Sequence, residues 1–167
     1  MTRKRACEIC GGSLSVRSAT ARKPYHYKLS GLNLVFLIGV EVEACRDCGA
    51  ESPSIPRLGE LHRIIAHHLI NKADRLAGDE LRFLRKLAGI PAKKFAELLR
   101  VTPEHLSGGE NGRRPLSYSV DKLARAIAAE ALESDETRAL LPQFPTEIGE
   151  ELAQLRFAFD QGWTRAA

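Results

Sequence analysis

The chain has 167 residues, with 25 Lys and Arg against 21 Asp and Glu, and 44% of its residues are hydrophobic. This length allows one domain or two small ones, and the composition excludes a wholly disordered chain. The longest apolar run, residues 34–40, is shorter than the roughly 20 residues that cross a bilayer, and no apolar leader follows the basic start of the chain. We therefore expect a cytoplasmic protein.

Charge is distributed unevenly along the chain. Residues 1–30 hold seven basic side chains and one acidic one, whereas residues 132–167 hold three basic and seven acidic side chains. A basic body with an acidic tail favours a polyanionic partner such as nucleic acid, but a solvated surface of mixed charge has the same composition.

Residues 1–56 show the pattern of short strands and turns. Aromatic residues alternate over residues 24–29, and apolar runs cover residues 34–38 and 40–44, which predicts three strands. Pro53 and Pro56 mark the end of this region.

Helical periodicity begins after this strand region. Apolar residues recur three or four apart from Leu58 to Leu76, which predicts a connecting helix over residues 57–78. Gly89 is a stop signal, and Thr102 followed by Pro103 is a helix start. These signals predict shorter helices over residues 79–88, 91–99, from 102 onward, and 117–131.

The tail, residues 132–167, is acidic and contains a last amphipathic segment. We expect a helix over residues 148–159, after two prolines. Its apolar side chains could pack on the chain's own domain, on a second subunit or on another protein; these are Leu152, Leu155, Phe157, Phe159 and Trp163.

Four cysteines stand at the spacing of metal ligands. Cys7 and Cys10 form one Cys-x-x-Cys-Gly motif, and Cys45 and Cys48 form a second one. Two intervening residues let both sulfurs converge on one ion, and the glycine permits a tight turn. Four thiolates favour one structural Zn²⁺ per chain, because they leave no open position for catalysis. An iron–sulfur cluster, disulfides or redox thiols are the alternatives.

Residues 81–116 carry the second signal, in the order of a helix-turn-helix. Ala96 is small where two helices must cross closely, and Val101 and Leu106 are apolar where a recognition helix packs back. This order, ending in Glu-Asn-Gly-Arg-Arg-Pro over residues 110–115, resembles the Cro/phage-repressor (XRE) helix-turn-helix.

The combination of both signals resembles the MqsA/YgiT-type antitoxin family over about residues 5–130. The resemblance implies an N-terminal zinc domain, a DNA-binding domain that dimerises, and autorepression of a toxin–antitoxin operon. In the family's best-known member the zinc domain also holds the toxin.

The expected fold is therefore α+β. A small β-rich zinc-binding domain over residues 1–56 is joined by the helix over 57–78 to an all-α helix-turn-helix domain over 79–131. An acidic helical tail over 132–167 follows.

The chain departs from the XRE pattern at two places. Ala92 stands where a polar residue usually begins the second helix, and Gly108 and Gly109 are expected to shorten the recognition helix. Base readout then falls to Thr102, Glu104, His105 and Ser107. The candidates for phosphate or backbone contacts are Lys93, Lys94, Asn111, Arg113 and Arg114.

The leading hypothesis is a dimeric, DNA-binding transcriptional repressor of antitoxin type that binds a toxin through its zinc domain. A stand-alone zinc-containing regulator without a toxin, or an interaction scaffold that has lost operator binding, are the alternatives. We expect no enzyme, because the polar residues show no nucleophile–base pair, carboxylate pair or phosphate loop.

Overall fold

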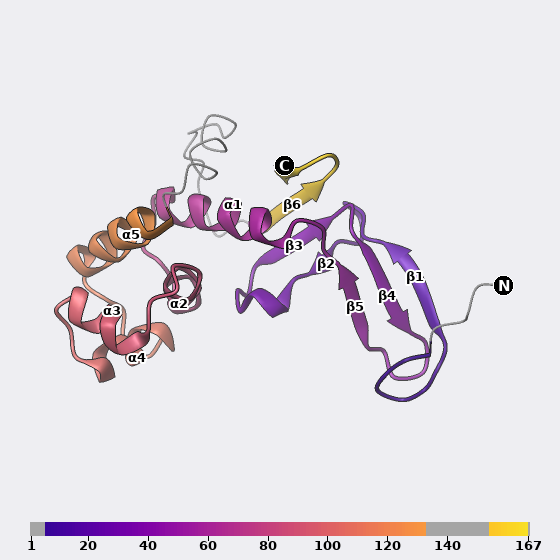
Figure 1. The fold of residues 1–167 in the computed structure, drawn as a ribbon, viewed down its shortest axis with the longest axis horizontal. Helices are drawn as coiled ribbons and strands as arrows, with labels where there is room; N and C mark the ends of the chain where they lie inside the picture. The colour runs from indigo at the N-terminus through magenta and orange to yellow at the C-terminus, as the bar shows by residue number, and fades with distance from the viewer. Residues whose placement is uncertain (1–5, 133–153, 167) are drawn as a thin grey trace. The chain divides into compact units, whose positions relative to one another are not determined.

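A computed structural model describes residues 6–132 and 154–166 as a mixed α+β structure with two sheets and five α-helices in these ranges (Figure 1). The elements are β1 Leu14–Ser18, β2 Tyr25–His26, a 3₁₀ turn Lys28–Ser30, β3 Val35–Ile38, β4 Glu41–Cys45, β5 Glu51–Ser54, α1 Leu58–Asn71, α2 Gly78–Leu87, α3 Ala92–Leu98, α4 Pro103–Glu110, α5 Tyr118–Leu132, β6 Leu155–Phe159 and β7 Trp163–Ala166.

The described residues form two compact units. The β unit comprises residues 6–27, 34–58 and 154–166, and the helical unit comprises residues 28–33 and 59–132. The chain therefore leaves the β unit before α1 and returns to it at β6.

One antiparallel sheet has the strand order β1-β4-β5. Its register places Val16 opposite Glu43 and Pro53 opposite Val42. Pro53 is tolerated because β5 is an edge strand, where a missing N–H breaks no inner ladder bond. The predicted strand over residues 40–44 is confirmed as β4, whereas β1 and β5 were not predicted.

The second sheet has the order β2-β3-β6-β7, and β6 pairs parallel to β3 with Phe157 opposite Leu37. The helix expected over residues 148–159 is wrong for residues 155–159, which form a strand; residues 148–153 lie outside the described residues. Leu155 and Phe157 are buried because they alternate toward the core, which is strand periodicity.

The tail's apolar side chains pack on the chain's own β unit. Phe157 is fully buried, and Leu155 and Trp163 are almost so. The Trp163 indole Nε1 donates to the carbonyl of Pro56 at 2.7 Å. Of the three expected locations, the chain's own domain is therefore the one that the structure shows for these residues.

In the helical unit, α4 packs against α2 and α3, and α5 packs against α2. The predicted cap at Thr102 is confirmed, because its Oγ1 accepts from the backbone N–H of His105 at 3.1 Å.

α1 ends at Asn71, earlier than the expected end at residue 78. The core consists of Leu81, Phe95, Ala96, Leu99, Leu106, Leu116 and Ala124.

A buried ion pair joins α5 to the segment between α1 and α2. The Arg125 guanidinium pairs with Asp121 at 3.0 Å, and each side chain is only 5% exposed. Asp121 also accepts from the backbone N–H of Leu76 at 2.9 Å. Arg125 donates further to four carbonyls that follow or end α1, those of Leu69, Ile70, Lys72 and Asp74.

α4 is short, as expected, with eight residues, but it includes Gly108 and Gly109 and ends after them. A Cβ on Gly109 would lie 2.9 Å from Leu116, whereas a Cβ on Gly108 would meet nothing within 4 Å. Gly109 is buried, so the exposed face of α4 loses no side chain through this glycine. Leu116 occupies the space that a side chain at Gly109 would need.

Two alanine substitutions should therefore have opposite effects on stability. A Cβ on Gly78, at the start of α2, would press on the carbonyl of Gly109 and lie 2.8 Å from that of Glu110. Gly78→Ala should lower the free energy of unfolding by about 1–3 kcal/mol. Gly108→Ala should raise it by up to about 1 kcal/mol, because alanine is the better helix former. Urea unfolding of the two variants checks this, and equal effects would refute the close α2–α4 approach.

Candidate functional site

Two turns with the same hydrogen bonds carry the four cysteines. In the first turn, Gly11 N donates to Cys7 O at 2.8 Å, and Cys7 N donates to Gly12 O at 2.9 Å. The second turn repeats this pattern around Cys45, with Gly49 and Ala50 as partners, at 3.1 and 2.8 Å. Both glycines need their positive φ, +73° at Gly11 and +72° at Gly49.

β4 brings the second turn next to the first. Leu14 at the start of β1 lies opposite Cys45 at the end of β4, so the turns before β1 and after β4 share one end of the sheet. The prediction that the four thiols lie close together is confirmed: all four sulfurs are within 4.8 Å of one another. Two of these approaches run between the turns, Cys7–Cys48 at 3.7 Å and Cys10–Cys45 at 3.5 Å.

These distances suit a tetrahedral metal site. Sulfurs bound at about 2.3 Å to one ion stand about 3.8 Å apart at the corners of a tetrahedron. Cys7 and Cys45 are buried, whereas Cys10 and Cys48 are exposed. The four cysteines can therefore hold a metal ion with all four positions filled by protein.

The thiols influence one another's ionisation. Backbone N–H groups of Cys48 and Asp47 lower the pKa of Cys45 to about 7. The N–H of Gly12 lowers the pKa of Cys10, but the neighbouring thiols of Cys45 and Cys48 outweigh it and raise that pKa to about 12. Four thiolates repel one another without a cation, and a bound dication would remove this repulsion.

The helical unit exposes most of the other predicted site residues. The start of α4 exposes Thr102, Glu104, His105 and Ser107 to solvent, while Leu106 points into the core. Four cations flank this surface in the sequence and are exposed: Lys93, Lys94, Arg113 and Arg114. Ala92 is also exposed, at the first position of α3.

Asn111 is exposed as well, but its side-chain amide is hydrogen-bonded to other residues of the unit. Its Nδ2 donates to the carbonyl of Ser107 at 2.8 Å, and its Oδ1 accepts from Arg82 at 2.5 Å. Glu110 is buried beside it and accepts from Arg85 at 2.5 and 3.0 Å. Sequence analysis missed these arginines, because only the fold brings α2 next to the end of α4.

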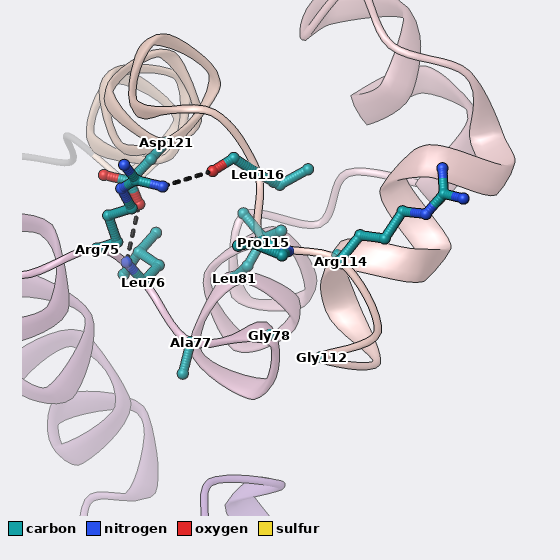
Figure 2. A pocket seen from close by; sticks show the side chains of 11 residues that line it. Arg75, Leu76, Ala77, Gly78, Leu81, Gly112, Arg114, Pro115, Leu116 and Asp121 are labelled. Atoms are coloured by element: carbon teal, nitrogen blue, oxygen red, sulfur yellow. Dashed lines mark hydrogen bonds between the residues drawn. The ribbon is translucent and has the colours of Figure 1, made fainter.

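A cavity of about 280 Å³ lies beside this surface, between the start of α2 and the segment that follows α4 (Figure 2). Arg75 donates to the carbonyl of Leu116 at 3.4 Å within it. Figure 2 shows Arg114 at the same cavity, extending away from Arg75. The walls are largely apolar and include the Asp121 carboxylate, while Arg75 and Arg114 are exposed residues at the rim.

No model of a known protein family and no curated protein matches the chain. Among the described residues, no helix is long and apolar enough to cross a membrane.

Proposed function

We propose that this protein is a DNA-binding transcriptional repressor of antitoxin type, with Zn²⁺ holding its β unit together. The soft four-thiol donor set supports zinc, since thiolates favour it over oxygen-preferring cations. When bound, the ion would supply folding free energy through Cys7, Cys10, Cys45 and Cys48, with no open position for a reaction.

The exposed polar start of α4 carries the DNA-binding proposal. One side of α4 is packed through Leu106 and Gly109, so only the opposite side is available to a ligand. A helix supported by two others, with its N-terminal residues exposed, is suited to the major groove. We infer that α3 and α4 form an XRE-type helix-turn-helix, in which Thr102, Glu104, His105 and Ser107 face bases.

The flanking cations are suited to the phosphate backbone. Lys93, Arg113 and Arg114 make no ion pair within the described residues, whereas Lys94 lies 3.6 Å from Glu97. Lysine and arginine contacts to phosphate add affinity without sequence preference. Asn111 instead supports the end of α4 through its bonds to Ser107 and Arg82.

The double variant Arg113→Ala/Arg114→Ala tests the DNA-binding proposal. Its binding to duplex DNA from upstream of its own gene should weaken. The slope of log affinity against log salt should become less negative by about 2, because two phosphate contacts are lost. Fluorescence anisotropy at several salt concentrations measures both quantities.

The matched control is Arg22→Ala/Lys23→Ala, which removes the same charge from exposed positions of the β unit. It should leave the salt slope near that of the unchanged protein. Equal losses in both double variants, or none in the first, would contradict the assignment to the helical surface. If the protein without substitutions shows no salt-dependent binding to this DNA, the result would favour the scaffold alternative.

The antitoxin part of the proposal concerns a homodimer and a toxin partner. It is supported by the order of the two cysteine motifs and the helical segments, which resembles the MqsA/YgiT-type family. Co-expression with the product of a small neighbouring gene should give a complex that metal removal dissociates, since the toxin would bind the β unit. A metal-independent complex, or none, would favour a regulator without a toxin.

A further inference from the structure

Asp47 lies in the second cysteine turn and contacts the first one. Its Oδ2 accepts from the backbone N–H of Ser13 at 3.2 Å. The carbonyl of Ser13 accepts in turn from the N–H of Arg46 at 3.2 Å. Asp47 directly precedes the metal-ligand candidate Cys48 in the chain, and its carboxylate contacts the opposite turn.

The two turns are equivalent, so each serves as an internal reference for the other. Asp47 corresponds to Ile9, the second residue between the cysteines of the first turn. Ile9 is 78% exposed and points to solvent, whereas Asp47 reaches across to the first turn. The difference shows that the contact is a feature of Asp47 and not of the turn type.

Gly12 accommodates this contact. A Cβ on Gly12 would overlap the Asp47 carboxylate and lie 2.9 Å from its Cγ. The equivalent position in the second turn is Ala50, which carries a Cβ and accepts the same hydrogen bond from its cysteine. The turn itself therefore does not require glycine at this position, but a side chain there would displace the Asp47 carboxylate from its present position.

We propose that Asp47 is a positioning residue that holds the two cysteine turns at the separation the metal requires. Its carboxylate occupies the space left by the missing side chain of Gly12. This inference rests on the proposed metal centre. The β1–β4 ladder and the bond from Arg46 N to Ser13 O bring the two turns together, and the Asp47 carboxylate adds a side-chain link between them close to the sulfurs. A link between the turns keeps the second pair near an ion that the first pair still holds, which slows release. Groups that orient ligands in this way typically change metal affinity by 10–100-fold.

The test is the rate of zinc release from the full chain to a chromogenic chelator. Asp47→Ala should release zinc about 10–100-fold faster. Asp47→Asn should stay within about threefold of the unchanged protein, because its amide oxygen still accepts from Ser13 N. Ile9→Ala is the matched control at the equivalent position and should leave the rate unchanged. Trp163 emission before chelator is added should be the same in all variants, which separates faster release from a lost fold.

Gly12→Ala disturbs the same contact by displacing the Asp47 carboxylate. Its effect on zinc release can be measured even if the Asp47→Ala variant does not fold. It should speed release in the unchanged background and have little further effect beside Asp47→Ala, since the clash needs the carboxylate. The proposal is overturned if Asp47→Ala releases zinc at the original rate, if Ile9→Ala matches it, or if Asp47→Asn is as fast as Asp47→Ala. An unchanged protein that binds no zinc would overturn the metal centre itself, which is a separate result.

Discussion

Removal of the metal is expected to unfold the β unit, which contains both sheets, while α2–α5 remain folded. A structural zinc contributes on the order of 10 kcal/mol of folding free energy, and a unit this small buries too little apolar surface to replace it. A β unit that stayed folded without the ion would keep the Cys7 and Cys45 thiols buried with no cation beside them. The helical unit keeps its own core around Phe95 and Leu106, so it does not depend on the metal.

Trp163 makes this result measurable, because it is the single tryptophan of the chain. It is 3% exposed in the β unit, so its emission should shift to the red when a chelator removes the metal. Far-ultraviolet circular dichroism should keep most of its helical signal. Added Zn²⁺ should restore the emission, and Mg²⁺ should not, because thiolates are poor ligands for it. Unchanged Trp163 emission after complete metal removal would show that the metal does not hold this unit together.

Arg125→Ala is expected to lower the free energy of unfolding of the helical unit by about 3–5 kcal/mol. The substitution removes donors from four carbonyls at the end of α1 and beyond it. It also leaves the Asp121 carboxylate buried and without its cation. A buried charge that has lost its partner costs far more than a lost surface pair.

Urea unfolding of the metal-loaded protein, followed by helical circular dichroism, measures this loss. Lys122→Ala on the same helix is the control; Lys122 is exposed and should change stability by no more than about 0.5 kcal/mol. The double variant Arg125→Ala/Asp121→Ala should lose less than the sum of its single variants, because it leaves no unpaired carboxylate. A loss below about 1 kcal/mol in Arg125→Ala would contradict a supporting role for this ion pair.

Much of the local structure could be predicted from the sequence because its signals are local. The repeated Cys-x-x-Cys-Gly spacing predicts a turn that joins two sulfurs, whatever the rest of the chain does. Thr102 and Pro103 place the start of α4 because a cap acts within one turn of helix. Apolar periodicity located the other helices to within a few residues, apart from the end of α1.

The tail shows where periodicity misleads. Leu155, Phe157 and Phe159 alternate, but Leu152 and Leu155 also fit a helical stripe, and a short segment satisfies both periods. The choice of strand depends on β3, whose free edge pairs with β6 from more than a hundred residues away. β5 was missed for a similar reason, since Pro53 argues against a strand unless that strand lies at an edge.

The sequence by itself determined the four-thiol motif, the helical periodicity and the order of a strand region followed by short helices, because each depends on residues close together in the chain. Only the tertiary structure decided that the tail completes a sheet of the β unit, that the start of α2 lies against the backbone of Gly109, and that Arg125 reaches the carbonyls at the end of α1 and beyond it. It also placed Asp47 against Gly12 and Ser13. These contacts join residues that are distant in sequence, and packing and buried charge select among arrangements that local propensity leaves equally open.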